Sequence, residues 1–93
     1  MPETKITRFF PESICNVIHQ DGTQLTDTTN GVEVVLHLRN GVPRFAEIIS
    51  GDHYADIGLT IEGKELVDYD GVFELPKEIL LMLKELGYTM EEA

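Results

Sequence analysis

Residues 32–49 read VEVVLHLRNGVPRFAEII, two runs of strand-forming residues on either side of the dipeptide Asn40-Gly41. Asn and Gly tolerate the positive φ angles that a two-residue hairpin loop requires, so this stretch predicts a β-hairpin. A two-residue loop would place Leu36 opposite Phe45. Because successive side chains of a strand point to opposite sides, this register sorts the hairpin into an apolar core face and a mixed outer face.

The two predicted faces differ in chemistry. The core face is apolar except for Glu47, and its residues are Val34, Leu36, Leu38, Pro43, Phe45 and Ile49. The outer face mixes charge with apolar area, and it carries Glu33, Val35, His37, Arg39, Val42, Arg44, Ala46 and Ile48. An apolar patch with a charged rim is typical of a protein interface. We therefore predict that a partner binds Val35, His37, Arg39, Val42, Arg44, Ala46 and Ile48, and that the basic members favour an anion or an acidic partner.

Similar turn signals recur along the whole chain. Apolar and threonine-rich runs lie between Asp21-Gly22, Asn30-Gly31, Asn40-Gly41, Gly51-Asp52, Glu62-Gly63 and Asp70-Gly71. Turn signals about 8 to 12 residues apart are typical of all-β domains. The fold class that we predict is mainly β (α+β): an antiparallel meander of about five to six strands, forming a curled sheet or a small barrel.

The N-terminal part of the meander has two interpretations. Residues 14–20 and 23–29 are expected to form strands in which Leu25 lies opposite both Ile18 and Leu36, so that three consecutive strands pair in chain order. A short helix beginning at Pro11 is the alternative for residues 11–20, because several apolar residues there also have helical spacing. Residues 5–10 are expected to be extended, with Phe9 or Phe10 in the core.

The connection between residues 42–49 and the strand at 54–61 is predicted to be a three-residue or bulged loop. A strict two-residue turn would place Glu47 opposite Asp56, and like charges on opposed strand positions are destabilising. Pro43 has no N–H to donate to a strand on its far side, so we expect strand pairing to fail there.

The C-terminal region predicts one amphipathic helix over residues 76–86 that packs on the sheet. Pro76 suits a first helical turn and Gly87 suits the position after the last one. The apolar stripe consists of Ile79, Met82, Leu83 and Leu86. Leu81 points to the opposite side, so it is a further candidate partner-binding residue.

Length and composition limit the class of protein. Its 93 residues predict a single domain over residues 1–93 with short mobile ends at 1–4 and 89–93. The only cysteine, Cys15, excludes an intrachain disulfide. The longest apolar run, residues 79–83, is too short to cross a bilayer. We therefore expect a soluble, cytoplasmic protein.

The net charge of −10 is unevenly distributed. Residues 1–46 carry five acidic and four basic side chains, whereas residues 47–93 carry twelve acidic and three basic ones. Nucleic-acid phosphates and anionic membrane surfaces bind through Lys and Arg. We therefore predict no direct binding to nucleic acid and none to membranes, and we interpret the charge mainly as a source of solubility.

Candidate catalytic and metal-binding groups are isolated. Cys15 and His19 would lie about 13 Å apart on a strand, too far to share a zinc ion. The segment from Asp68 to Glu74 lacks the spacing of a calcium loop. His53 has acidic neighbours, but the sequence places no nucleophile beside it.

No nucleotide-binding, hydrolase or metalloprotease motif occurs. The sequence therefore predicts a non-enzymatic accessory or regulatory protein, without a cofactor or metal, that binds a protein partner or a second copy of itself. One alternative is an acidic inhibitor that imitates nucleic-acid phosphates. Another is a small-ligand-binding domain or a small enzyme.

Overall fold

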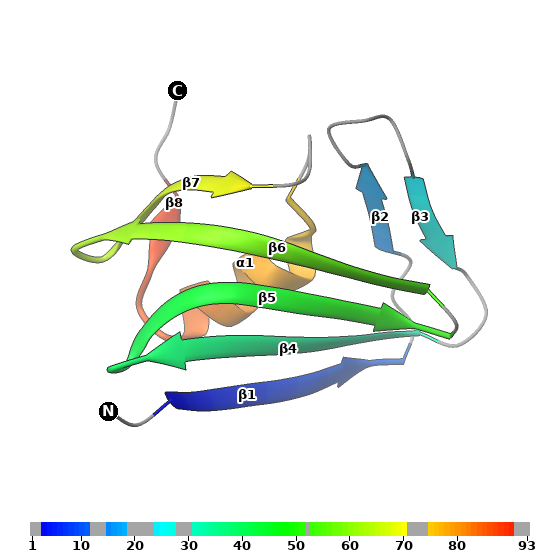
Figure 1. Ribbon diagram of the computed structural model, residues 1–93, viewed down its shortest axis with the longest axis horizontal. Helices are drawn as coiled ribbons and strands as arrows, with labels where there is room; N and C mark the ends of the chain where they lie inside the picture. The colour runs from blue at the N-terminus through cyan, green and yellow to red at the C-terminus, as the bar shows by residue number, and fades with distance from the viewer. Residues whose placement is uncertain are drawn as a thin grey trace.

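One curled sheet of six strands forms the body of the molecule, and a helix lies behind it (Figure 1). The computed structural model describes residues 3–11, 15–18, 24–27, 31–51, 53–70 and 75–90. Its strands are β1 (Glu3–Phe10), β2 (Cys15–Ile18), β3 (Gln24–Asp27), β4 (Val32–Arg39), β5 (Val42–Ser50), β6 (His53–Glu62), β7 (Glu65–Asp70) and β8 (Thr89–Met90), and its helix is α1 (Lys77–Glu85). The predicted α+β class, curled antiparallel sheet and C-terminal helix are confirmed.

The sheet has the strand order β1-β4-β5-β6-β7-β8, and β2 and β3 form a separate two-stranded sheet. All neighbouring strands are antiparallel except β7 and β8, which are parallel. The residues expected at the mobile ends include Glu3, Thr4, Thr89 and Met90, which lie in β1 and β8.

The N-terminal pairing differs from the predicted chain order. β1, rather than β3, is the neighbour of β4, and its pairs run from Glu3↔Arg39 to Phe10↔Val32. Leu25 faces Val17 instead of Ile18. The eight residues of β1 provide a longer hydrogen-bonded ladder for β4 than the four residues of β3, which explains the difference.

Residues 15–18 form a strand rather than a helix. The other residues of the alternative helix over 11–20 lie largely outside the described part of the chain. Of the two phenylalanines at the end of β1, Phe10 packs against the core, whereas the side chain of Phe9 is 55% exposed.

The β4–β5 hairpin turns where the sequence predicts. Asn40 and Gly41 have φ angles of 54° and 79°, in the left-handed region that the two-residue loop requires. Leu38 pairs with Pro43, also as expected from the loop length.

A β-bulge then changes the register. His37 pairs with Phe45 rather than with Arg44, so Arg44 is the extra residue on β5. Because side chains alternate along a strand, every later residue of β5 points to the side opposite to the predicted one. Ala46 and Ile48 are completely buried in the core, and Phe45 and Glu47 lie on the outer face, the sheet face turned away from α1. The predicted placement of these residues is therefore wrong.

The predicted three-residue or bulged connection to β6 is also wrong. Ser50 pairs with His53, so two residues separate the strands, and Glu47 does lie opposite Asp56. After the bulge, this short loop places the apolar residues of β5 and β6 together in the core. Contacts of Glu47 with Tyr54 and His37 offset the repulsion between Glu47 and Asp56.

Pairing between β5 and β6 ends at Phe45↔Gly58 and does not reach Pro43, which confirms the expectation for that residue. Beyond this point β6 pairs with β7 alone. Tyr88 lies near this end of the sheet: its hydroxyl donates a hydrogen bond to the Gly41 carbonyl (3.2 Å), and the Lys64 ammonium lies 4.9 Å from its ring centre. Tyr88 therefore connects the turns of two hairpins.

The core lies between the sheet and α1. It contains Val32, Val34, Leu36, Leu38, Ala46, Ile48, Ala55, Ile57, Leu59, Leu66, Leu75, Ile79, Met82, Leu83 and Tyr88. Leu86, the last residue of the predicted stripe, caps the helix and is partly exposed. Arg8 on the inner side of β1 forms an ion pair with Glu85 of α1.

Glu78 is a buried acid in the first turn of α1, a position where the helix dipole favours negative charge. Its Oε2 has no hydrogen-bond partner among the described residues.

The first prediction concerns the turn of the central hairpin. Gly41→Ala should lower the free energy of unfolding by roughly 1 to 2 kcal/mol, because a Cβ in the left-handed region approaches the following carbonyl oxygen. Gly58→Ala is the control, since Gly58 lies within a strand and the nearest atom to its added Cβ would be the Asp70 Cβ at 3.4 Å. Urea unfolding should show the loss only for Gly41→Ala, and equal stability of the parent and this variant would contradict the assignment.

The second prediction concerns the packing of α1. The side chains of Leu83 and Leu81 are 2% and 48% exposed, so the helix offers a matched pair. Leu83→Ala should lose about 2 to 5 kcal/mol of unfolding free energy through the cavity it creates, whereas Leu81→Ala should be nearly silent. Chemical denaturation measures both, and a large loss for Leu81→Ala in the monomer would show that α1 has a second buried side.

Candidate interaction surface

The outer face of the sheet is built from cross-strand rows of side chains. Paired residues of antiparallel strands point to the same side, so the registers define each row. One row consists of Phe9, Glu33, Ile49 and Tyr54. The next consists of Thr7, Val35, Glu47 and Asp56, and a third consists of Lys5, His37, Phe45, Gly58 and Asp70.

Three aromatic rings on this face are exposed. The exposed fractions are 55% for Phe9, 38% for Phe45 and 55% for Tyr54. They lie on β1, β5 and β6, so three strands each contribute one ring. Several exposed rings on one face indicate an interaction surface more strongly than single exposed hydrophobic residues, which are common in soluble proteins.

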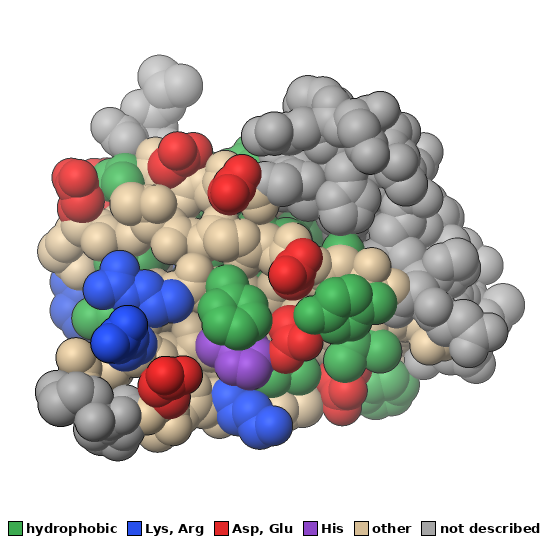
Figure 2. All heavy atoms as spheres, in the orientation of Figure 1, with side chains coloured by type: hydrophobic (Ala, Val, Ile, Leu, Met, Phe, Trp, Pro, Cys, Tyr) green, Lys and Arg blue, Asp and Glu red, His purple; other side chains and the backbone are tan. Residues whose placement is uncertain are grey.

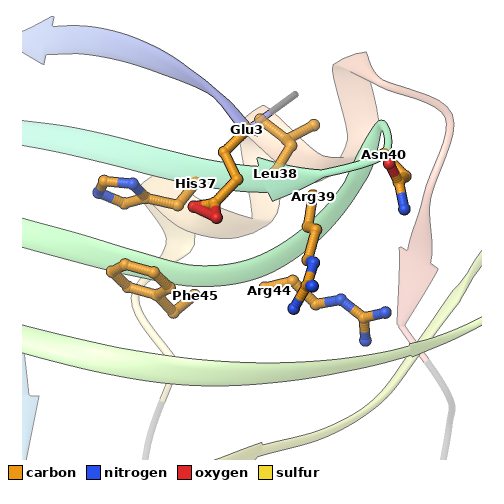
Figure 3. A pocket seen from close by; sticks show the side chains of 7 residues that line it. All are labelled: Glu3, His37, Leu38, Arg39, Asn40, Arg44 and Phe45. Carbon is orange, nitrogen blue, oxygen red and sulfur yellow. The ribbon is translucent and has the colours of Figure 1, made fainter. Parts of the chain in front are cut away.

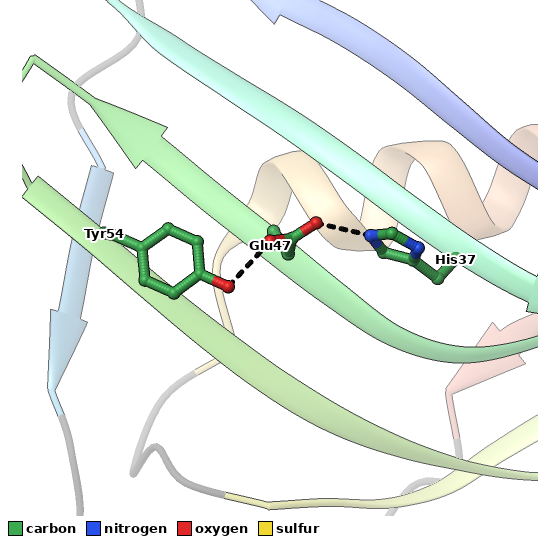
Figure 4. A network of polar contacts seen from close by, with 3 residues as sticks. All are labelled: His37, Glu47 and Tyr54. Atoms are coloured by element: carbon green, nitrogen blue, oxygen red, sulfur yellow. Dashed lines mark hydrogen bonds and ion pairs between the residues drawn. The ribbon is translucent and has the colours of Figure 1, made fainter.

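A polar network crosses three strands of the outer face (Figure 4). The Tyr54 hydroxyl donates a hydrogen bond to Glu47 Oε2 (2.6 Å), and His37 Nε2 contacts Glu47 Oε1. An ionised carboxylate can only accept, so the hydrogen of the second contact is carried by His37 Nε2. Glu47 thus holds side chains from β4 and β6 in defined positions.

The network changes the acidity of its members. The hydrogen bond from Tyr54, and then the bond from His37, lower the pKa of Glu47 below its ordinary value of 4.5, because both stabilise the carboxylate. The bond to Glu47 raises the pKa of Tyr54 to about 12, since the phenolate would lose this bond and face a negative charge.

A second contact fixes the His37 ring from another side. Its plane stacks on Phe45, with ring centres 4.1 Å apart and an interplanar angle of 8°. His37 is therefore held by both a hydrogen bond and a stacked ring. Phe45 remains partly exposed to solvent despite this stacking.

An open depression of about 600 Å³ adjoins this stack at the turn end of the hairpin (Figure 3). Its lining residues are Glu3, His37, Leu38, Arg39, Asn40, Arg44 and Phe45. Arg39 is the last residue of β4, and Arg44 is the bulged residue of β5. The bulge thus brings both guanidinium groups to one depression.

Charges of both signs lie on the outer face. Figure 2 shows basic side chains at its left side and at its lower centre, and acidic ones along its upper part, through its centre and along its lower edge, with hydrophobic side chains between them. The registers place Asp56, Asp68 and Asp70 on the outer side of β6 and β7. The face therefore offers charges of both signs around an aromatic centre.

The predicted partner-binding residues do not form one surface. His37, Arg39, Val42 and Arg44 belong to the outer side of the hairpin, and Val35 points to the same side but is buried. Ala46 and Ile48 are core residues, because the bulge reverses their direction. Leu81 is exposed, but α1 lies behind the sheet, so Leu81 belongs to another surface.

The sequence interpretation missed Phe9, Phe45, Glu47 and Tyr54 as members of this face. Glu47 carried the available signal, since it was the one charged residue on a predicted core face. A bulge between Pro43 and Glu47 removes this conflict.

The isolated chemical candidates gain no support. His19, Asp52 and Glu74 lie outside the described residues, as does the side chain of His53. Within the described ranges, no three His, Cys, Asp or Glu residues are close enough to hold a metal ion. None of the helices in the described segments has the length and apolar character needed to span a membrane.

Comparisons of the chain with protein-family models, with curated proteins and with solved structures find no match.

The third prediction concerns the Glu47 network. Because folding lowers the pKa of Glu47, its ionised form stabilises the fold in full above pH 4.5, and this contribution disappears as the pH falls through the lowered value. The difference in unfolding free energy between the parent and Glu47→Gln should therefore shrink below pH 4.5. Urea unfolding across this pH range measures it.

Tyr54→Phe provides the control for this prediction. It keeps the ring but removes the hydrogen bond that lowers the Glu47 pKa most. The Glu47 pKa, followed by NMR, should therefore rise. An unchanged Glu47 titration in this variant would contradict the proposed cause.

Proposed function

We propose that this protein is a non-enzymatic interaction protein that binds a protein partner on the outer face of its sheet. The observation that carries the proposal is the exposure of Phe9, Phe45 and Tyr54 together on the one sheet face that α1 leaves open. Aromatic residues are enriched in the centres of protein interfaces, where they supply much of the binding free energy.

The ordering of this face supports the proposal. Glu47 orients Tyr54 and His37, and Phe45 stacks on His37. Side chains that are already held in position lose less conformational entropy when a partner binds. The charges of both signs around the rings would steer the encounter and set the orientation of the partner.

A second candidate function is an acidic inhibitor that imitates nucleic-acid phosphates. Asp56, Asp68 and Asp70 lie on one side of two neighbouring strands, which favours this candidate. If this candidate is right, Asp68→Asn with Asp70→Asn should abolish binding to a basic, nucleic-acid-binding partner. If substitution of the aromatic residues abolishes partner binding instead, the first proposal is favoured.

The fourth prediction tests the proposed surface with a double variant, Phe9→Ser with Tyr54→Ser. Both side chains are more than half exposed, so the fold should persist, although with lower stability because the Tyr54 hydrogen bond to Glu47 is lost; circular dichroism and urea unfolding check this. Affinity capture from the source cells, followed by identification of the bound proteins, should recover a partner with the parent and lose it with the double variant.

Leu81→Ser is the matched control, because it removes a similarly exposed apolar side chain from α1. Sedimentation velocity at low and high ionic strength tests a second copy as the partner. A monomer under all conditions, together with identical capture by the parent and both variants, would show that the outer face is ordinary surface.

A further inference from the structure

Two arginines that form no ion pair with any other described residue lie at the turn end of the β4–β5 hairpin. Arg39 and Arg44 are exposed and line the same depression (Figure 3). Among the described residues, Arg8 forms an ion pair with Glu85 and His37 contacts Glu47, and neither contact includes these arginines. Glu3 also lines the depression, but no ion pair joins it to either guanidinium.

This arrangement favours an incoming anion. Two guanidinium groups at one depression repel each other, and an oxyanion between them would remove that repulsion. Each guanidinium presents several N–H donors in a planar fork that matches the two oxygens of a carboxylate or phosphate. The bulge is therefore more than a register correction, because it directs Arg44 toward the side of Arg39.

Aromatic rings line the depression beside the two arginines. The stacked rings of His37 and Phe45 line one side, and Phe45 is also one of the exposed rings of the outer face. The depression consequently opens onto the surface described above. An extended chain could place acidic groups at the arginines and continue over the rings.

We infer that Arg39 and Arg44 bind an acidic segment of the protein partner, with a carboxylate or phosphate oxyanion between the two guanidinium groups. This inference rests on the proposed function and names the partner's chemistry.

The net charge of −10 does not prevent this contact. At physiological ionic strength the Debye length is about 8 Å, so exposed acids farther away than this are largely screened. Glu3, the cross-strand neighbour of Arg39, is the acid that lines the depression itself, and one carboxylate against two guanidinium groups leaves a net positive charge there. Asp68 and Asp70 lie on β7, which β6 separates from Arg44 on β5, and which β5 and β6 separate from Arg39 on β4.

The test uses a short fluorescein-labelled peptide of alternating glutamate and alanine residues, titrated with the full chain and followed by fluorescence anisotropy. Arg39→Gln with Arg44→Gln should weaken binding by about tenfold or more, because two charge-assisted contacts are lost. Lys77→Gln with Lys84→Gln removes the same charge from exposed positions of α1 and should change binding less than twofold. The corresponding glutamine–alanine peptide should not bind.

NMR amide shifts locate the peptide. The expected result is a set of shifts confined to residues 37–45 and absent in the arginine double variant. Equal binding by the two double variants, or no binding by the parent, would overturn the inference. Inorganic phosphate is a second probe: displacement of the peptide supports a shared oxyanion site, whereas phosphate binding without peptide binding overturns the assignment to an acidic segment.

Partner capture with the two kinds of double variant distinguishes failure of this inference from failure of the proposed function. If the partner captured from cells is lost with the aromatic double variant but kept with the arginine double variant, the outer face is an interface and the acidic-segment inference is wrong.

Discussion

The β-bulge at Arg44 is the constraint on which the arrangement of both sheet faces depends. Without the extra residue, Glu47 would point into an apolar core, where an unpaired carboxylate costs several kcal/mol even after relaxation. With it, Ala46 and Ile48 fill the core opposite α1, and Glu47 reaches the outer face. The bulge at Arg44 thus both stabilises the core and places the candidate surface residues outside it.

The polar network follows from this reversal. Once Glu47 lies outside, its two oxygens accept hydrogen bonds from side chains on both neighbouring strands, Tyr54 on β6 and His37 on β4. These bonds compensate the carboxylate for its like-charged neighbour Asp56. They also immobilise aromatic groups that remain in contact with water, a combination that favours binding over simple solubility.

The turn end of the sheet depends on a second backbone constraint. Pro43 has no N–H, so the β5–β6 ladder stops at Phe45, and β6 continues with β7 alone. Tyr88, which follows α1, contacts the turns of both hairpins through its hydroxyl and its ring. The arginine-lined depression therefore belongs to a hairpin end that is anchored to the rest of the fold.

The sequence by itself determined the features that depend on local chemistry. The turn at Asn40-Gly41 follows from φ preferences of adjacent residues, and the helix follows from Pro76, its apolar spacing and Gly87. Only the tertiary structure decided that β1 rather than β3 pairs with β4, because strand partners distant in sequence compete through total ladder length and core packing. It also decided the bulge, since one inserted residue leaves local propensities unchanged but reverses every later side chain. For that reason, sequence reasoning found Arg39 and Arg44 on the outer side of the hairpin but placed Phe45 and Glu47 on the wrong face.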